Sequence, residues 1–270
     1  MQAEKARRFL SLHEPGRPLL LPNPWDVGSA RLLEHLGFQA LATTSSGFAA
    51  TLGRLDYQVT RDEAIAHAAE LAGAVTVPVS ADLENGFADE PEGVAETIRL
   101  ALGAGLAGCS VEDATGRDDD PIYDLDLAVA RVAAAVEVAH GGDVHLVITA
   151  RAENHLHGRK DLDDTIGRLR AYQEAGADVL YAPGLRKPDD LRRVVEELDR
   201  PVNVLTVPGA PEVAQLAELG VARVSVGGAF AYAAIGGAVE AARELLDAGT
   251  YGFVERSAAG WRAVHEAFGE

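Results

Sequence analysis

Short apolar runs alternate with longer amphipathic segments from one end of the chain to the other. The runs are continuously apolar, which is typical of parallel strands buried on both faces. The eight predicted strands span residues 19–21, 40–43, 77–81, 109–112, 145–150, 179–181, 202–206 and 224–226. Helical patterns between them span residues 27–35, 61–74, 91–103, 127–139, 162–174, 188–198 and 211–218. This alternation predicts an α/β fold, a (β/α)8 TIM-type barrel.

A doubly wound open sheet is the alternative fold, but no Gly-x-Gly-x-x-Gly sequence follows the first predicted strand. Two more helical patterns, residues 230–248 and 253–268, follow the last strand without a linker. We therefore expect residues 1–270 to form one domain. A minimal barrel does not need the C-terminal helices of residues 229–270, so we expect them to contact another copy of the chain in a homo-oligomer, a dimer or a tetramer.

Charge and composition limit the possible partners. The chain has 42 acidic and 24 basic residues, a net charge of −18. Nucleic acids and anionic membranes require a basic surface, so neither is an expected partner. No apolar run approaches the roughly 20 residues that cross a bilayer. The single cysteine, Cys109, gives no internal disulfide and favours a cytoplasmic location, and its place within a strand indicates a core residue.

Three carboxylates stand where predicted strands end. Asp82 and Glu84 follow the third strand, and Glu112 ends the fourth. In a barrel these ends meet at one face, where catalytic groups lie. The two-residue spacing of Asp82 and Glu84 would aim both side chains the same way on a regular strand. Clustered like charges need a cation or a proton, and oxygen ligands favour Mg²⁺, with Mn²⁺ also possible. Alternatively, the acids cap the helices that follow.

Arg151 ends the fifth predicted strand. A guanidinium that emerges into an acidic barrel mouth can hold a carboxylate or a phosphonate in a bidentate fork. The alternative is a structural ion pair with Glu112 or Glu153.

Small polar residues provide the remaining candidates. The turn Ser46-Gly47-Phe48 follows the second strand, and its backbone N–H groups could bind an anionic substrate. Thr44, before it, and Asn203, on the seventh strand, complete the predicted substrate-binding set. Asp56 lies in a loop, where it could reach the water shell of a metal or only shape the turn. The His155-x-His157 pair has no third ligand nearby and is interpreted as solvent-exposed.

The order of these features resembles the isocitrate lyase/phosphoenolpyruvate mutase superfamily. The matching features are Ser46-Gly47-Phe48, Asp82-x-Glu84-x-Gly86-Phe87, Glu112-Asp113 and Ala150-Arg151. Asp56 falls where the family has an acidic loop residue near its metal.

The resemblance implies a modified (β/α)8 barrel, often a tetramer of dimers that exchange a C-terminal helix. It implies Mg²⁺ bound through Asp82, with Glu84 and Glu112 acting largely through waters, and a 2-oxo acid held by the serine–glycine turn and Arg151. Family members cleave or form C–C or P–C bonds beside an α-oxo carboxylate through a pyruvate-like enolate. Ser46, Asp56 and Arg151 are accordingly the catalytic candidates.

The chain also departs from the family. Isocitrate and methylisocitrate lyases carry a Lys-Lys/Arg-Cys-Gly-His lid after the fourth strand, whereas residues 113–121 here contain neither cysteine nor lysine. Those lyases also have a substrate-binding glutamate after the sixth strand, where this chain has Ala182-Pro183-Gly184. The lid lysine and asparagine of phosphoenolpyruvate mutase are not evident either.

The sequence therefore predicts a Mg²⁺-dependent carbon–carbon lyase for a small 2-oxo acid or a 2-hydroxy/2-methyl dicarboxylate. Three alternatives remain open. The first is an enzyme of P–C bonds like phosphonopyruvate hydrolase or phosphoenolpyruvate mutase, and the second is an oxaloacetate decarboxylase. The third is a protein that binds a 2-oxo acid without turnover.

Overall fold

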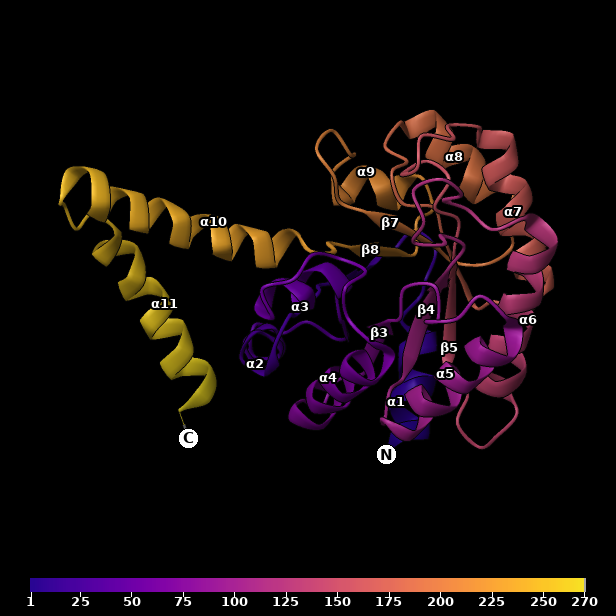
Figure 1. Cartoon of the computed structure of the whole chain (residues 1–270), viewed down its shortest axis with the longest axis horizontal. Coiled ribbons are helices and arrows are strands. Elements are labelled where there is room, and N and C mark those ends of the chain that lie inside the picture. The colour runs from indigo at the N-terminus through magenta and orange to yellow at the C-terminus, as the bar shows by residue number, and fades with distance from the viewer. Residues whose placement is uncertain (270) are drawn as a thin grey trace.

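The apolar runs form a single, all-parallel sheet that curves into a barrel (Figure 1). The computed structural model describes residues 1–269. The strands are β1 (Leu19–Leu21), β2 (Leu41–Ala42), β3 (Val79–Asp82), β4 (Gly108–Glu112), β5 (Val147–Arg151), β6 (Val179–Tyr181), β7 (Val202–Leu205) and β8 (Arg223–Ser225). They follow the order β1-β8-β7-β6-β5-β4-β3-β2. Between β1 and β2 the Ala42 N–H donates to the Pro22 carbonyl at 3.1 Å. The prediction of an α/β barrel is confirmed.

Strand register brings the polar strand ends to one face, which we call the mouth. Asp82 on β3 is level with Ser110 on β4. Glu112 on β4 is level with Arg151 on β5, and Arg151 with Tyr181 on β6. Glu112 and Arg151 are therefore direct neighbours in the sheet, and Asp82 lies at the same face on the strand next to that of Glu112.

Helices cover the outside of the barrel. They are α1 (Gln2–Ser11), α2 (Val27–His35), α3 (Ser45–Thr51), α4 (Arg61–Ala74), α5 (Pro91–Gly103), α6 (Leu125–His140), α7 (Leu162–Glu174), α8 (Pro188–Glu196) and α9 (Val213–Glu218). The sequence did not predict α1, whose Ala6 and Phe9 are completely buried in a cluster with residues of β1 and β5.

The interpretation of residues 46–48 as a turn is wrong, because they lie in α3. Thr44 caps this helix, and its Oγ1 accepts a hydrogen bond from the Gly47 N–H at 3.3 Å. A run of serine, glycine and alanine has little amphipathic pattern, so the short helix had no signal except its cap.

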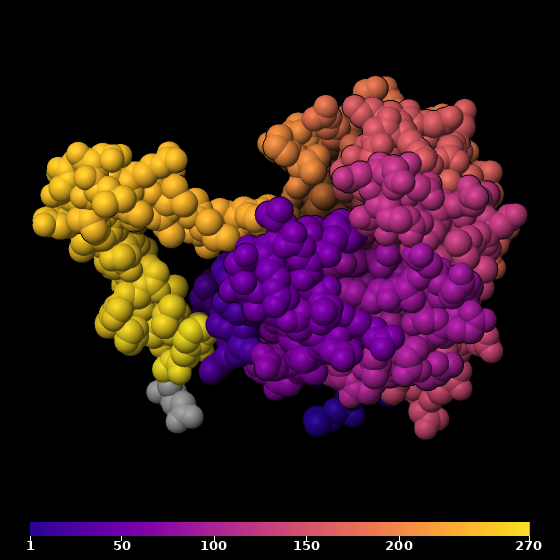
Figure 2. All heavy atoms as spheres, in the orientation of Figure 1, coloured from indigo at the N-terminus to yellow at the C-terminus, as the bar shows by residue number. Residues whose placement is uncertain are grey.

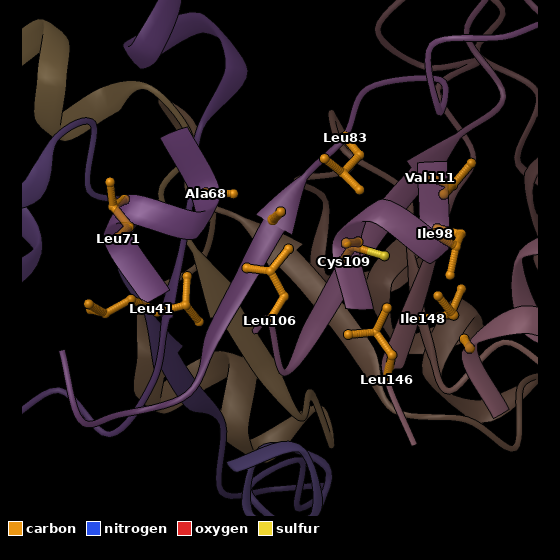
Figure 3. Close-up of a cluster of buried hydrophobic side chains, with 14 of the residues drawn as sticks. Leu41, Ala68, Leu71, Leu83, Ile98, Leu106, Cys109, Val111, Leu146 and Ile148 are labelled. Atoms are coloured by element: carbon orange, nitrogen blue, oxygen red, sulfur yellow. The ribbon is translucent and has the colours of Figure 1, made fainter. Parts of the chain in front are cut away.

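Apolar side chains fill the space between the sheet and the helices. One cluster joins strands β2 to β5 to helices α2, α4, α5 and α6 (Figure 3). Cys109 lies in this cluster and is completely buried, as its position in a strand predicted.

The C-terminal segment extends away from the barrel (Figures 1 and 2). It consists of α10 (Ala229–Arg243), a π-helical turn η1 (Glu244–Ala248) and α11 (Phe253–Phe268). We call residues 229–268 the C-terminal arm. Of these residues only Ala231 is buried. The arm touches the barrel again where the Arg31 guanidinium of α2 lies 5.0 Å from the centre of the Phe268 ring. No helix within residues 1–269 is long and apolar enough to span a membrane.

Candidate active site

Asp82 lies at the centre of the mouth, because β3 ends at this residue. Its Oδ2 accepts hydrogen bonds from the N–H and the hydroxyl of Ser45, at 3.2 and 3.0 Å. Its Oδ1 lies 2.9 Å from Nη1 of Arg151 and 3.3 Å from the Ser110 hydroxyl. The start of α3 and the ends of β3, β4 and β5 therefore meet at one carboxylate.

Arg151 is surrounded by acids. Its Nη1 pairs with Asp82 at 2.9 Å, its Nη2 with Glu112 at 3.0 Å and its Nε with Glu153 at 2.7 Å. The Glu112 and Glu153 side chains are only 3 % and 2 % exposed. Burial raises the pKa of both carboxyl groups, although Arg151 opposes the shift. The alternative role considered for Arg151, a structural ion pair with Glu112 or Glu153, is thus present. Its predicted role in binding substrate stays a prediction.

Glu84 differs from the other acids because it has no cationic partner. Its backbone is left-handed, with φ of 48°, directly after β3. The residue is 5 % exposed, and no protein group within residues 1–269 donates a hydrogen bond to its carboxylate. Burial, with Asp82 and Asp56 nearby, raises the pKa of Glu84 to about 8. The residue as a whole is buried but its carboxylate oxygens keep contact with solvent, and a carboxylate without a protein donor in such a place fits a site that receives a hydrated cation.

The side-chain direction predicted for Glu84 from strand spacing does not apply. The strand ends at Asp82, and the Glu84 backbone turns so that its carbonyl accepts the Glu112 N–H at 3.0 Å. Asp82 and Glu84 nevertheless line one small cavity of about 10 Å³ between β3 and α3.

Tyr57 covers Glu112 from the loop between α3 and α4. Its hydroxyl donates a hydrogen bond to Glu112 Oε1, while Arg151 holds the other carboxylate oxygen. Burial and Glu112 raise the pKa of Tyr57 far above its usual value, so the phenol stays protonated and remains a donor. The adjacent Asp56 lines the mouth cavity, and burial followed by the charge of Asp82 raises its pKa. Asp56 was predicted from this loop as a candidate site residue, and Tyr57 was not.

A cavity of about 200 Å³ opens beside Asp56, Asp82 and Arg151. At about 30 Å³ per water molecule, it has room for six or seven waters. Thr44, Ser46, Arg151 and Asn203, from the predicted substrate-binding set, line it together with Asp56, and their contact with a substrate stays a prediction. Asn203 is held by its neighbours, because its Nδ2 donates to Ser225 at 2.9 Å and its Oδ1 accepts from Arg223 at 2.9 Å.

Gly47 and Phe48 lie beside the cavity instead of lining it. A Cβ on Gly47 would lie 2.5 Å from the Thr44 methyl group and 3.2 Å from Ala231, so a side chain would push α3 away from its cap and from α10. The Phe48 ring stacks on His67, with ring centres 3.8 Å apart. Both residues position α3, and a direct contact with substrate stays a prediction.

The donor set at the mouth suits a hard divalent cation, because Asp82, Glu84 and Glu112 offer only oxygen atoms. Within residues 1–269 their ligand atoms do not form a group that lies within 4.8 Å of one another. This spacing is compatible with the expected arrangement, in which Asp82 binds the ion directly and the two glutamates act through waters. The unpartnered carboxylate of Glu84 is the observation that makes the residues fit a metal.

Three residues of the site, Ser45, Tyr57 and Glu153, were not predicted as site residues. Ser45 and Tyr57 hold Asp82 and Glu112 by hydrogen bonds, and Glu153 was considered only as an ion-pair partner. Strand order could have indicated Glu153, which lies two residues after the end of β5. Tyr57 has no comparable signal, because a left-handed backbone with φ of 60° turns it toward Glu112.

Comparison with known proteins shows the family of the chain. Residues 9–246 match the phosphoenolpyruvate phosphomutase family. A solved structure from Burkholderia cenocepacia J2315, proposed to be a lyase or mutase, is 51 % identical and superposes with a TM-score of 0.92 over 97 % of this chain and 96 % of that chain. The structure of 2,3-dimethylmalate lyase is 27 % identical, with a TM-score of 0.82 over 93 % and 89 % of the two chains.

A relative from Pseudomonas aeruginosa LESB58, oxaloacetate decarboxylase, is 30 % identical over 246 residues, which cover 87 % of this chain and 83 % of the relative. The chain belongs to the phosphoenolpyruvate phosphomutase family, within the isocitrate lyase/phosphoenolpyruvate mutase superfamily. The members that it matches include lyases and a decarboxylase.

Proposed function

We propose that this protein is a Mg²⁺-dependent carbon–carbon lyase. Its substrate would be a small 2-oxo acid or a 2-hydroxy/2-methyl dicarboxylate, cleaved through a pyruvate-like enolate. The observation that supports the proposal is Glu84, a buried residue that lines one small cavity with Asp82 and whose carboxylate has no donor within residues 1–269, at the end of a barrel that also holds Arg151.

Asp82, Glu84 and Glu112 would hold the metal. When bound, Mg²⁺ supplies positive charge near the oxygen that becomes negative as the carbon–carbon bond breaks. Arg151, once its contact with Asp82 is loosened, would orient the substrate carboxylate, and the Ser46 hydroxyl lines the same cavity. Fixed donors matter most where charge develops, and removing one costs about 2.7–4 kcal/mol of barrier. Asp56 would order water around the site.

The segment after β4 supports a small substrate. Residues 113–121 contain no cysteine or lysine, and none of them lines the cavity. The Thr115 N–H donates to the Pro121 carbonyl at 2.9 Å, and Arg117 pairs with Asp89 at 3.1 Å. The segment is thus held by its own contacts, and the lid acid that larger tricarboxylates require has no counterpart in it.

Decarboxylation of oxaloacetate is the second candidate reaction. The oxaloacetate decarboxylase relative aligns with 87 % of this chain. Loss of carbon dioxide from this 2-oxo dicarboxylate also leaves a pyruvate enolate, so the same residues would serve.

A substrate panel tests the proposal. Purified protein is incubated with Mg²⁺ or with a chelator, and with oxaloacetate, 2,3-dimethylmalate, 2-methylisocitrate or phosphonopyruvate. We expect Mg²⁺-dependent pyruvate formation from a dicarboxylate, lost in Asp82→Ala. Release of inorganic phosphate would indicate P–C chemistry instead. Calorimetric binding of oxalate without turnover of any compound would indicate a binding protein.

We also propose that the C-terminal arm contacts a second copy of the chain. The arm exposes large apolar residues, among them Leu246 at 82 %, Tyr251 at 67 % and Trp261 at 62 %. Such a surface is typical of a protein–protein interface. Light scattering after size exclusion should give a dimer or tetramer, and Leu246→Glu with Trp261→Glu should reduce it. A monomeric wild-type protein would contradict this. The cytoplasmic location expected from the single cysteine stays a prediction.

A further inference from the structure

A second group of ligand side chains lies at the end of the barrel opposite the mouth. His140 is the last residue of α6, His145 precedes β5 by two residues, and Asp178 immediately precedes β6. Because parallel strands all begin at the same face, these positions are far from the catalytic end of a barrel. The mouth chemistry uses none of the three residues.

The two imidazoles converge on one carboxylate. His140 Nε2 lies 3.0 Å from Asp178 Oδ2, and His145 Nε2 lies 2.9 Å from Asp178 Oδ1. The rings stack with centres 3.8 Å apart and planes inclined by 14°, so both Nε2 atoms face the same side. Within residues 1–269 this is the one group of three histidine, cysteine or acidic residues whose ligand atoms all lie within 4.8 Å of one another.

Asp178 is fixed in place by the backbone of β5. Its Oδ2 accepts the Ile148 N–H at 2.8 Å, and its own N–H donates to the Ile148 carbonyl at 2.9 Å. Its side chain is 6 % exposed, whereas those of His140 and His145 are 24 % and 40 % exposed. Asp178 is therefore a rigid, buried ligand. Because His140 and His145 are partly exposed, an ion can reach it from solvent.

We propose that His140, His145 and Asp178 form a second metal site, specific for a transition-metal dication such as Zn²⁺. Zn²⁺ binds histidine and carboxylate at about 2.0–2.1 Å, which separates ligand atoms of a tetrahedron by about 3.3 Å. The two nitrogen–oxygen distances are within a few tenths of an ångström of that value. Water would fill the fourth position.

Binding requires no co-reactant. Each imidazole that donates its Nε2 proton to Asp178 would carry that proton on Nδ1 instead, which leaves the Nε2 lone pair for the metal. The exchange can pass through solvent, because both rings are partly exposed. Two nitrogen donors favour Zn²⁺ over Mg²⁺, so this site would not compete for the cation of the mouth.

The site would act on stability. A bound ion would connect the end of α6 to the starts of β5 and β6, and an ion that binds only the folded chain shifts unfolding to higher temperature. Substrate turnover at the mouth would not depend on it.

Metal titration of the full-length chain tests the proposal. Protein stripped by a chelator is prepared as Asp82→Ala, which removes the proposed mouth site. Co²⁺ is added while its visible absorption is followed, and Zn²⁺ then displaces it in a competition titration. The test variant is His140→Gln with His145→Gln in this background. The matched control is His155→Gln with His157→Gln, which removes the other close histidine pair.

We expect one equivalent of Co²⁺ with the strong absorption of tetrahedral coordination, both in the parent and in the control. Loss of even an outer-sphere partner weakens metal binding roughly 10–100-fold, so the test variant should bind Zn²⁺ at least about 100-fold more weakly. Zn²⁺ should raise the Tm of the parent and leave that of the test variant unchanged. If the double variant folds poorly, the single variant His145→Gln, at the most exposed ligand, should likewise weaken Zn²⁺ binding and remove the Tm increase. Equal Zn²⁺ affinity in test and control variants, or absence of a stoichiometric site in the parent, would overturn the proposal.

Discussion

Buried acidic side chains have hydrogen-bond donors at one end of the barrel, and at the other end one of them has none within residues 1–269. At the far end, Asp178 receives hydrogen bonds from His140, His145 and the Ile148 N–H. Burial alone would raise the pKa of Asp178, but the hydrogen bonds from His140, Ile148 and His145 lower it. At the mouth, burial raises the pKa of Glu84 to about 8, and no donor within residues 1–269 compensates.

This difference distinguishes a satisfied acid from one that lacks a counter-charge. A single buried carboxylate with three donors is stable as it stands. The mouth instead gathers Asp82, Glu84, Glu112 and Glu153 around one arginine. An excess of buried negative charge has a free-energy cost that only a cation or protons can relieve. We infer that function, and not folding, accounts for the mouth cluster.

The largest expected effect on stability comes from removing the positive charge of Arg151. Arg151→Met leaves Asp82, Glu112 and Glu153 without their shared partner, and breaking a buried ion pair costs about 3–5 kcal/mol. Arg193→Met is the matched control, because Arg193 also pairs with two acids but is 48 % exposed. Exposed pairs contribute only about 0–1 kcal/mol. Urea unfolding measures the free energy of unfolding of both variants. Equal losses in the two variants would contradict the claim that the ion pairs of Arg151 matter more than exposed ones.

Asp82→Asn should have the next largest effect, which we expect on the rate of turnover. The variant keeps the shape of the side chain and removes its charge, so turnover should fall roughly 10²–10³-fold, as for other lost groups that stabilise developing charge. His140→Gln with His145→Gln, at the other end, should leave kcat unchanged. Steady-state assays with the best substrate of the panel check this. If both variants lost activity equally, the division of roles between the two ends would be wrong.

Glu84→Gln should change the pH dependence of stability. The pKa of Glu84 is about 8 in the folded chain, above its ordinary value of about 4.3. The folded state therefore holds the proton more tightly, and the stabilisation is complete below about pH 4 and is lost as pH rises through about 8. Between pH 6 and pH 9 this contribution falls by roughly 2.6 kcal/mol, so in metal-free protein the Tm should fall about 5–10 °C more in wild type than in Glu84→Gln, at about 2–4 °C per kcal/mol. If the Tm of wild type and of Glu84→Gln changed with pH in the same way, the claim that Glu84 has no partner in the folded chain would be refuted.

Tyr57→Phe should have the smallest effect. It removes one hydrogen bond to Glu112 from a side chain that is 41 % exposed, and such a bond contributes about 0.5–1.5 kcal/mol. Tyr251→Phe, on the C-terminal arm, is the control and should change the free energy of unfolding very little, because Tyr251 is 67 % exposed. Denaturant titration compares the two. A loss of several kcal/mol in Tyr57→Phe would mean that Tyr57 organises the whole mouth.

Local signals were enough to predict most of the barrel. Helices α4 and α7 begin and end where their patterns predicted, because Thr60 and Asp161 cap their first turns. Helix α3 was missed because its small residues carry no such pattern. The strand ends that form the mouth followed from the fold, since parallel strands align their carboxyl ends.

What the sequence could not predict depends on contacts between distant residues. The three ion pairs of Arg151 join residues up to 69 positions apart. The left-handed backbones of Glu84 and Tyr57 are not encoded by glycine, so no local rule indicates them. His140 and Asp178 are 38 positions apart, and the packing of α6 on β5 together with the pairing of β5 with β6 brings them together.

The most direct test is a crystal structure with Mn²⁺ and oxalate, a mimic of the pyruvate enolate, in which anomalous scattering locates the cation. We expect a Mn²⁺ peak at the mouth, bonded directly to an Asp82 carboxylate oxygen, with Glu84 and Glu112 facing its waters. Oxalate should bind beside it within reach of Arg151. A mouth without Mn²⁺, in which Arg151 still pairs with all three acids while oxalate binds elsewhere, would contradict the account.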